Sequence, residues 1–332
     1  MQNQHDHTQV LQEKPLVSFI VTAYNLPAEM LRECIESILA LSMRPQEREI
    51  ILVDDGSDKT PLTELDDLAN HLIYFRQENQ GVSAARNAGL RIATGKFVQF
   101  IDGDDRLITE NYEHCLQILQ TKQPDMLLFN ATTSQKSAKS EPDCQGPFQG
   151  SDYMRHHNIK SSVCSYVFHR SLIGNLHFTV NKQFSEDEEF TPLLLLRSEK
   201  LYTTEAKAYF YRQHRQSATH QKSEERLRKR FGDSLDTILR LNEKADRMPA
   251  ADRQAMQRRV AQLTMDYIYN VIVETRDRKF LNEQLKELER NGLFPLPDRN
   301  YTKKYNWFRR MTNSQAGLRM LMLALPYTKR ER

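Results

Sequence analysis

Cysteine is scarce in this sequence, and its spacing excludes the sites that cysteine usually builds. Four cysteines lie far apart (Cys34, Cys115, Cys144 and Cys164), with no CxxC pair and no histidines clustered around them. A zinc finger needs closely spaced ligands, and a small secreted domain needs a dense disulfide framework. Both classes of protein are therefore excluded.

Long hydrophobic runs are also missing. The longest apolar runs are residues 193–196 and 320–325, far below the roughly 18–20 residues that span a bilayer. The polar leader, residues 1–14, lacks the apolar segment of a signal peptide. We therefore expect a cytoplasmic protein.

The net charge is small but unevenly distributed. The 332 residues carry a net charge of +3, too little for a protein that coats nucleic acid, so we expect no nucleic-acid partner. Residues 301–332 hold eight Lys and Arg residues and one acid, a net charge of +7, which leaves −4 on the rest of the chain. A mildly acidic body thus ends in a basic tail.

Buried strands and amphipathic helices alternate in the first hundred residues. Residues 17–22 (VSFIVT), 49–53 (EIILV) and 97–101 (FVQFI) are short apolar runs typical of buried parallel strands. Residues 27–41 and 83–93 between them have the apolar spacing of helices. This alternation predicts an α/β fold with a mostly parallel central sheet.

The pattern changes near residue 222. Downstream, three long segments have helical periodicity: residues 226–241, 251–275 and 280–289. We therefore predict a domain over residues 15–222 and a helical C-terminal region over residues 223–332.

Polar, turn-forming residues follow three of the predicted strands, at Thr22–Asn25, Asp54–Ser57 and Asp102–Asp105. Ligands of open parallel sheets bind beyond the carboxyl ends of the strands. The three carboxylates of the last turn repel one another unless a cation lies among them, and Mg²⁺ or Mn²⁺ bound to a phosphate would satisfy them. The alternative is an ordinary solvated turn. Neither GxGxxG nor GxxxxGK[ST] is present, so neither usual phosphate motif applies.

The order VSFIVTAYN, EIILVDDGSDKT and NQGVSAARNAGLRIATGKFVQFIDGDD resembles the inverting family 2 glycosyltransferases of the GT-A fold, over about residues 15–115. The resemblance implies a nucleotide-diphosphate sugar as donor, for which we expect a UDP-sugar, and Mn²⁺ or Mg²⁺ as cofactor. It also implies displacement at the anomeric carbon with inversion. The QxxRW element of the processive synthases is missing, which favours the transfer of one sugar.

The resemblance also assigns roles to individual residues of the donor site. Asp54 corresponds to the acid that binds the nucleotide base, and Asp104 and Asp102 correspond to the metal-binding acids, with Asp102 also facing the ribose or sugar. The remaining residues expected to bind the nucleotide sugar are Thr22, Tyr24, Asn25, Asp55, Arg86 and Asp105.

An acidic pair further along the chain corresponds to the catalytic base of the family. Asp187 aligns with the base that takes the proton of the acceptor hydroxyl, and Glu186 aligns with its neighbour. A purely structural alternative exists, because Ser185 and Glu188 have the spacing of a helix capping box. In the basic segment at residues 209–217, His214 is a candidate third metal ligand. Arg212 and Arg215 there are candidates to neutralise the leaving group.

Acceptor recognition has no readable motif, and we expect a saccharide or lipid-linked saccharide of a cell-surface polysaccharide. The basic tail, residues 301–332, mixes cations with aliphatic and aromatic residues, as helices at anionic membrane surfaces do. The alternative is that this segment packs on the body of the protein.

Two other functions stay open: a catalytically silent family member that binds nucleotide sugar or membrane, and a nucleotidyltransferase. The latter would need a glycine-rich basic loop after the first strand, which is missing.

Overall fold

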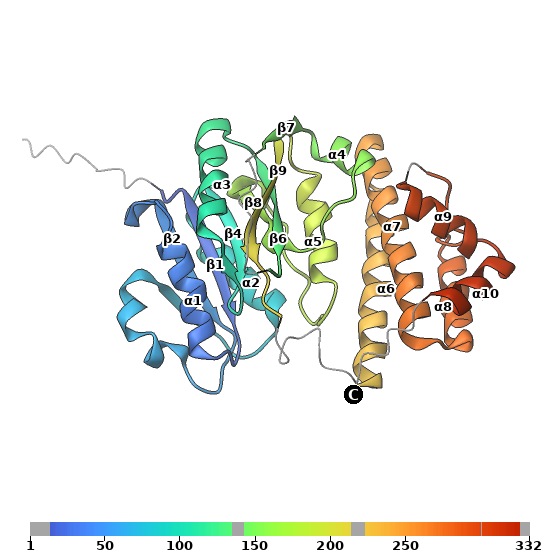
Figure 1. Cartoon of the computed structure of the whole chain (residues 1–332), viewed down its shortest axis with the longest axis horizontal. Helices are drawn as coiled ribbons and strands as arrows, with labels where there is room; N and C mark the ends of the chain where they lie inside the picture. The colour runs from blue at the N-terminus through green and yellow to red at the C-terminus, as the bar shows by residue number, and fades with distance from the viewer. Residues whose placement is uncertain (1–13, 135–142, 214–222, 300, 326–332) are drawn as a thin grey trace, which may run out of the picture.

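A mixed nine-stranded sheet forms the N-terminal part of the computed structural model, which describes residues 14–134, 143–213, 223–299 and 301–325 (Figure 1). The order of the hydrogen-bonded strands is β3-β2-β1-β4-β8-β6-β9-β5, and β7 pairs with β9 outside this order. The strands are β1 (Val17–Ala23), β2 (Arg48–Asp54), β3 (Ile73–Arg76), β4 (Phe97–Asp102), β5 (Arg106–Leu107), β6 (Met126–Thr132), β7 (Gln145–Phe148), β8 (Tyr166–His169) and β9 (Leu201–Phe210).

The half of the sheet that contains β1 is parallel. Strand β1 lies between β2 and β4 and pairs with both in parallel, and β3 pairs in parallel with β2. Strand β8 is antiparallel to β4 and β6, whereas β6 and β9 are parallel. The α/β fold with a mostly parallel sheet that the sequence predicts is therefore confirmed.

Helices cover the sheet because each buries one apolar side. In α1, the predicted stripe is buried at Leu31, Cys34, Ile35 and Ile38. The helices of this part are α1 (Ala28–Leu39), α2 (Val82–Ile92), α3 (Thr109–Lys122), α4 (Gly150–His156) and α5 (Glu186–Leu195).

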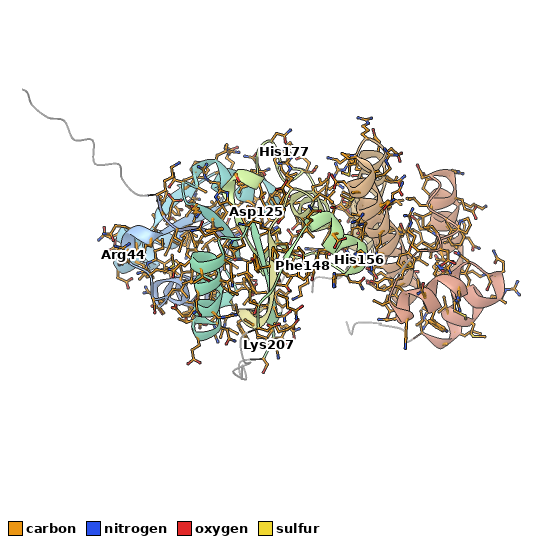
Figure 2. The ribbon with its side chains drawn as sticks, turned by 90° about the horizontal axis from the view of Figure 1, so that it is seen from above. Arg44, Asp125, Phe148, His156, His177 and Lys207 are labelled. Carbon is orange, nitrogen blue, oxygen red and sulfur yellow. The ribbon has the colours of Figure 1, made fainter. Side chains whose placement is uncertain are left out.

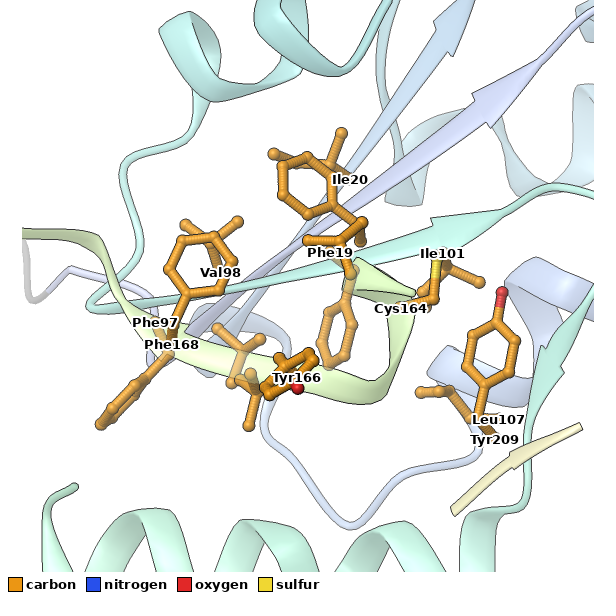
Figure 3. Packing of buried hydrophobic residues seen from close by; sticks show 14 of the residues in the cluster. Phe19, Ile20, Phe97, Val98, Ile101, Leu107, Cys164, Tyr166, Phe168 and Tyr209 are labelled. Carbon is orange, nitrogen blue, oxygen red and sulfur yellow. The ribbon is translucent and has the colours of Figure 1, made fainter. Parts of the chain in front are cut away.

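Aromatic side chains fill the core between the sheet and these helices. Figure 3 shows Phe19 of β1, Phe168 of β8 and Tyr209 of β9 among them, all at most 2% exposed. Their burial gives the sheet a rigid interior, since close-packed cores transmit displacement rather than absorb it. The loops at the ends of these strands therefore start from fixed positions.

The C-terminal region is a bundle of helices with a hydrophobic core of its own. Its helices are α6 (Glu224–Asp246), α7 (Ala250–Thr275), α8 (Arg278–Arg290), α9 (Lys303–Thr312) and α10 (Gln315–Ala324). Phe308, Leu318 and Leu321 are buried in that core, so the described part of the basic tail packs on the body through one of its faces. Within the described residues, no helix is both long and apolar enough to cross a membrane.

The two parts are joined along α7, which packs against α4 beside the sheet. The buried guanidinium of Arg258 donates hydrogen bonds to the backbone carbonyls of Met154 (3.0 Å) and His157 (2.8 Å). Arg259 donates to the hydroxyl of Ser161 at 2.7 Å. Seen from above, His156 and Phe148 lie on the side of the sheet domain that faces these helices, and Arg44 lies at the opposite end (Figure 2).

Candidate active site

Three strand ends converge at one edge of the sheet. Thr22 of β1 is in register with Asp102 of β4, and Ala23 is in register with Asp54 of β2. Because the strands are parallel, the polar turns that follow them meet at the same edge. A cleft of about 880 Å³ opens there.

Two walls with α5 between them form this cleft. The strand-end wall contains residues that follow β1, β2 and β4 or belong to α2, among them Thr22, Tyr24, Asn25, Asp55, Arg86, Asp102 and Asp104. The helix wall belongs to α6 and α7 and contains Arg226, Arg230, Phe231, Ser234, Asp266, Tyr267 and Asn270. The first turn of α5 contributes Glu186, Asp187 and Glu188.

A buried arginine ties the strand-end wall to α5. Arg86 of α2, 3% exposed, donates one Nη to Asp187 at 2.7 Å and to Glu186 at 3.2 Å. Its other Nη donates to Asp102 at 3.0 Å. Residues 100 positions apart in the sequence thus form one ion cluster. The structure places the Arg86 guanidinium against carboxylates, and its expected contact with the nucleotide stays a prediction.

Burial controls the protonation of this cluster. Burial raises the pKa of Asp187 to about 7, and Arg86 opposes that rise. The pKa of Glu186 is also raised by burial. Burial disfavours the charge of Arg86, but the attraction of Asp187 and Asp102 raises its pKa well above the usual value. Asp187 is therefore the carboxylate whose proton affinity suits proton transfer near neutral pH.

The start of α5 is not built as a capping box. Ser185 adopts a left-handed conformation (φ 64°), and its side chain makes no hydrogen bond that caps the helix. Its hydroxyl instead lies 2.9 Å from that of Ser234 in α6. The capping-box interpretation of Ser185 and Glu188 is therefore wrong, because α6 engages the serine that would cap the helix.

Helix α6 supports the segment that precedes the acidic pair. The buried ammonium of Lys182 donates to the hydroxyl of Thr237 at 2.8 Å and pairs with Asp236 at 2.7 Å. The Arg226 guanidinium lies over the ring of Phe184, 5.4 Å from its centroid. Helix α6 thus holds the segment that leads to Asp187, and Arg86 holds Asp187 itself.

The acidic turn after β4 divides its carboxylates between the cleft and the interior. Asp102 and Asp104 line the cleft, whereas Asp105 is 1% exposed. Asp105 accepts hydrogen bonds from the hydroxyl of Tyr209 (2.7 Å) and the backbone N–H of Arg212 (2.8 Å). Burial raises the pKa of Asp105 to about 8. Its carboxylate thus fastens the turn to β9 and does not face the cleft as the sequence predicted.

The turn offers part of a site for a divalent ion. Among the described side chains, no group of three or more His, Cys, Asp or Glu residues is arranged to hold a metal. Asp102 and Asp104, however, both line the cleft and are separated by one residue at the end of β4. Mg²⁺ and Mn²⁺ accept one or two carboxylates when phosphate oxygens and water complete the shell. The two acids therefore fit such an ion bound together with a diphosphate.

The adjacent acids after β2 have different surroundings. Asp54 is fully buried, and its carboxylate accepts hydrogen bonds from the Ser57 N–H (2.9 Å) and the Tyr74 hydroxyl (2.8 Å). It does not line the cleft, although the sequence assigned it to the nucleotide base. Asp55 does line the cleft, and it accepts a hydrogen bond from the Gly81 N–H at 2.8 Å.

The other predicted donor residues are only partly brought together. Thr22, Tyr24 and Asn25 line the cleft, and the ring of Tyr24 is 50% exposed. Arg212 lies behind the acidic turn, where its Nε donates to the Asp104 carbonyl at 2.8 Å. His214 and Arg215 lie outside the described residues.

Sequence reasoning missed the helix wall. Arg226, Ser234 and Asn270 line the cleft from helices that carry no recognisable motif. Their only signal is helical periodicity, which places residues on a face without indicating what that face meets.

Comparisons with known proteins are consistent with this geometry. The structure resembles that of Staphylococcus aureus TarS (residues 1–349, with UDP-GlcNAc) with a TM-score of 0.64 at 17% identity, covering 93% of this chain and 90% of that one. It resembles the mannosyltransferase PcManGT of Pyrobaculum calidifontis, solved with GDP-Man and Mn²⁺, with a TM-score of 0.51 at 14% identity, covering 96% and 89%. This chain, with its mixed, mostly parallel sheet, a cleft at the strand ends and a C-terminal helical region, thus has the GT-A fold.

The sequence comparisons give the family. Residues 18–173 match the model of Glycosyl transferase family 2, and this part of the chain belongs to that family. It is 28% identical over 220 residues to the uncharacterized glycosyltransferase EpsJ of Bacillus subtilis, covering 62% of this chain and 63% of EpsJ. It is 26% identical over 204 residues to the minor teichoic acid biosynthesis protein GgaB of the same organism, covering 59% of this chain and 23% of GgaB. The chain thus spans less than two thirds of either relative.

Proposed function

We propose that this protein is an inverting glycosyltransferase that moves one sugar from a nucleotide-diphosphate sugar to a hydroxyl of a saccharide or lipid-linked saccharide. The observation that carries this proposal is the cluster in which Arg86 joins Asp102, at the strand ends, to Glu186 and Asp187. In this cluster the candidate base, Asp187, shares one guanidinium with Asp102 of the acidic turn, which supports a base beside the donor site. Single displacement needs a base opposite the leaving group.

Asp187 is the base in this mechanism. Its Oδ1 accepts a hydrogen bond from Arg86 and its Oδ2 accepts one from the Val163 N–H at 3.1 Å, so the carboxylate is held in one orientation. The acceptor hydroxyl gives its proton to Asp187 while its oxygen bonds to the anomeric carbon. The bond from that carbon to the diphosphate breaks, and the diphosphate leaves with the electron pair. Attack from the opposite side inverts the configuration.

The strand-end wall would hold the donor. Asp55, Tyr24 and Asn25 line the cleft and would contact the nucleoside, and Asp102 and Asp104 would hold Mg²⁺ or Mn²⁺. When bound, such an ion neutralises the charge of the leaving diphosphate. A UDP-sugar is the donor we favour, because the S. aureus TarS structures contain UDP or UDP-GlcNAc.

The pathway and cellular location are also proposals. The relationship to GgaB, a teichoic acid biosynthesis protein, supports a role in the synthesis of a cell-surface polymer. Nucleotide sugars are cytoplasmic substrates, so we place the reaction in the cytoplasm, on the inner face of the plasma membrane where a lipid-linked acceptor is presented.

Donor hydrolysis tests the proposal without knowledge of the acceptor. The purified protein is incubated with a panel of nucleotide sugars, with and without Mn²⁺, and free nucleoside diphosphate is measured. We expect metal-stimulated release from one donor class and loss of that release in Asp104→Ala. Stabilisation of the fold by a nucleotide sugar with no release at any protein concentration would instead indicate a catalytically silent binding protein.

A further inference from the structure

Helix α10 is apolar on both sides, although only one side is covered. Leu318 and Leu321 are buried in the helical core. Met320 and Leu323 point away from that core, 57% and 86% exposed. These two residues are three positions apart and therefore share one face of the helix. A helix that is hydrophobic all round normally has both faces covered, so the outer face of α10 indicates a partner.

The exposed apolar side chains are concentrated in this part of the molecule. Seven large hydrophobic side chains are exposed among the described residues, and three of them, Trp307, Met320 and Leu323, lie in α9 and α10. Both helices pack at the end of the molecule beyond α7, on the far side from the sheet (Figure 1). They therefore leave the cleft open while presenting an apolar surface.

The positive charge of the same two helices indicates that the partner is anionic. Helices α9 and α10 contain five cations and no acid. Arg309 is paired with Asp298, whereas Lys303, Lys304, Arg310 and Arg319 are exposed. A protein whose body is acidic has here a surface of one sign with apolar side chains between the charges. Interfacial helices combine cations and apolar residues in this way, because anionic headgroups attract the cations while the apolar side chains enter the acyl boundary.

We propose that the exposed faces of α9 and α10 dock the protein on an anionic lipid bilayer through Trp307, Met320 and Leu323. The packed side of α9 is joined to the helix wall of the cleft. Tyr305 of α9 donates a hydrogen bond to Asp266 of α7 at 2.7 Å, and Asp266 lines the helix wall of the cleft. Docking by this surface would thus connect the helix wall of the cleft to the membrane through α7 and α9.

Flotation with lipid vesicles tests the docking surface independently of enzymatic activity. The full chain is mixed with phosphatidylcholine vesicles that do or do not contain phosphatidylglycerol. We expect recovery with the anionic vesicles only, and weaker recovery at high salt. The variant Met320→Glu/Leu323→Glu should lose roughly tenfold or more in partitioning, because its apolar face can no longer enter the bilayer. Lys303→Gln/Lys304→Gln should lose about 30-fold.

The matched control is Ile73→Glu/Phe75→Glu, which places the same two charges on side chains of β3 that are 43% and 37% exposed. It should float like the unchanged protein. Thermal unfolding verifies that each variant is folded. Equal flotation of the Met320→Glu/Leu323→Glu variant, or no flotation of the unchanged protein, would overturn the proposal. So would a change of oligomeric state in that variant, since a second copy of the chain would then cover the face.

Discussion

The two walls of the cleft hold their charged side chains in different ways. The Arg86 side chain of the strand-end wall is 4% exposed, its partners Glu186 and Asp187 in α5 are 15% and 19% exposed, and its partner Asp102 is 35% exposed. On the helix side, Lys182 pairs with Asp236, whose side chain is 55% exposed, and Arg230 pairs with Glu274 at 29% and 20% exposure. Water screens an exposed pair but not a buried one. Substitutions that remove a charge should therefore change activity and stability strongly at the strand-end wall and weakly at the helix wall.

The largest effect is expected where the buried cluster meets the reacting atoms. Asp187→Asn keeps the size of the side chain but removes its ability to take a proton. We expect transfer to fall by about a hundredfold to ten-thousandfold, while binding of the nucleotide sugar measured by calorimetry is retained. Glu199→Gln, at an exposed position outside the cleft, is the control. Activity of Asp187→Asn near that of the control would rule out this base.

Removing the cation at the centre of the cluster should reduce stability as well as activity. Arg86→Met leaves three carboxylates without their shared partner, and breaking a buried pair in this way costs about 3–5 kcal/mol. Urea unfolding measures the loss of free energy. In Arg44→Met the lost side chain is 71% exposed and paired with Glu47, so the change should be small. Equal losses in the two variants would show that burial does not distinguish Arg86.

The pH dependence follows from the same burial. Burial raises the pKa of Asp187 to about 7, and only its ionised form accepts a proton. The rate should therefore rise with pH, about tenfold between about pH 6 and a plateau above about pH 8. Measurement of kcat/KM for transfer over this range checks the sign. A flat profile, or a rate that falls as pH rises through 7, would contradict the assignment.

The smallest effect is expected from the helix wall. Ser234→Ala removes the hydrogen bond to Ser185, a neutral interaction of about 0.5–1.5 kcal/mol. We expect kcat to fall about two- to tenfold with no change in nucleotide binding, because α5 loses one of its two supports. Ser171→Ala, at an exposed serine outside the cleft, is the control. A loss as large as that of Asp187→Asn would show that α6 takes part in the chemistry directly.

Asp54 and Asp55 show where sequence prediction succeeded and where it failed. The turn after β2 and its place at the sheet edge follow from an apolar run that ends in polar residues, and both are found. The choice between the two acids does not follow, because successive residues of a strand point to opposite sides. The Tyr74 hydroxyl, which engages Asp54, comes from β3 and has no local signal.

The sequence by itself determined the local elements of this protein: the buried strands, the covering helices and the acidic turns. It could do so because hydrophobic periodicity and turn chemistry act over a few residues. Only the tertiary structure decided that Arg86 joins Asp102 to Asp187, that α6 holds Ser185, and that α10 leaves an apolar face uncovered. These contacts join residues that are distant in the chain, so their identity depends on packing that no local pattern contains.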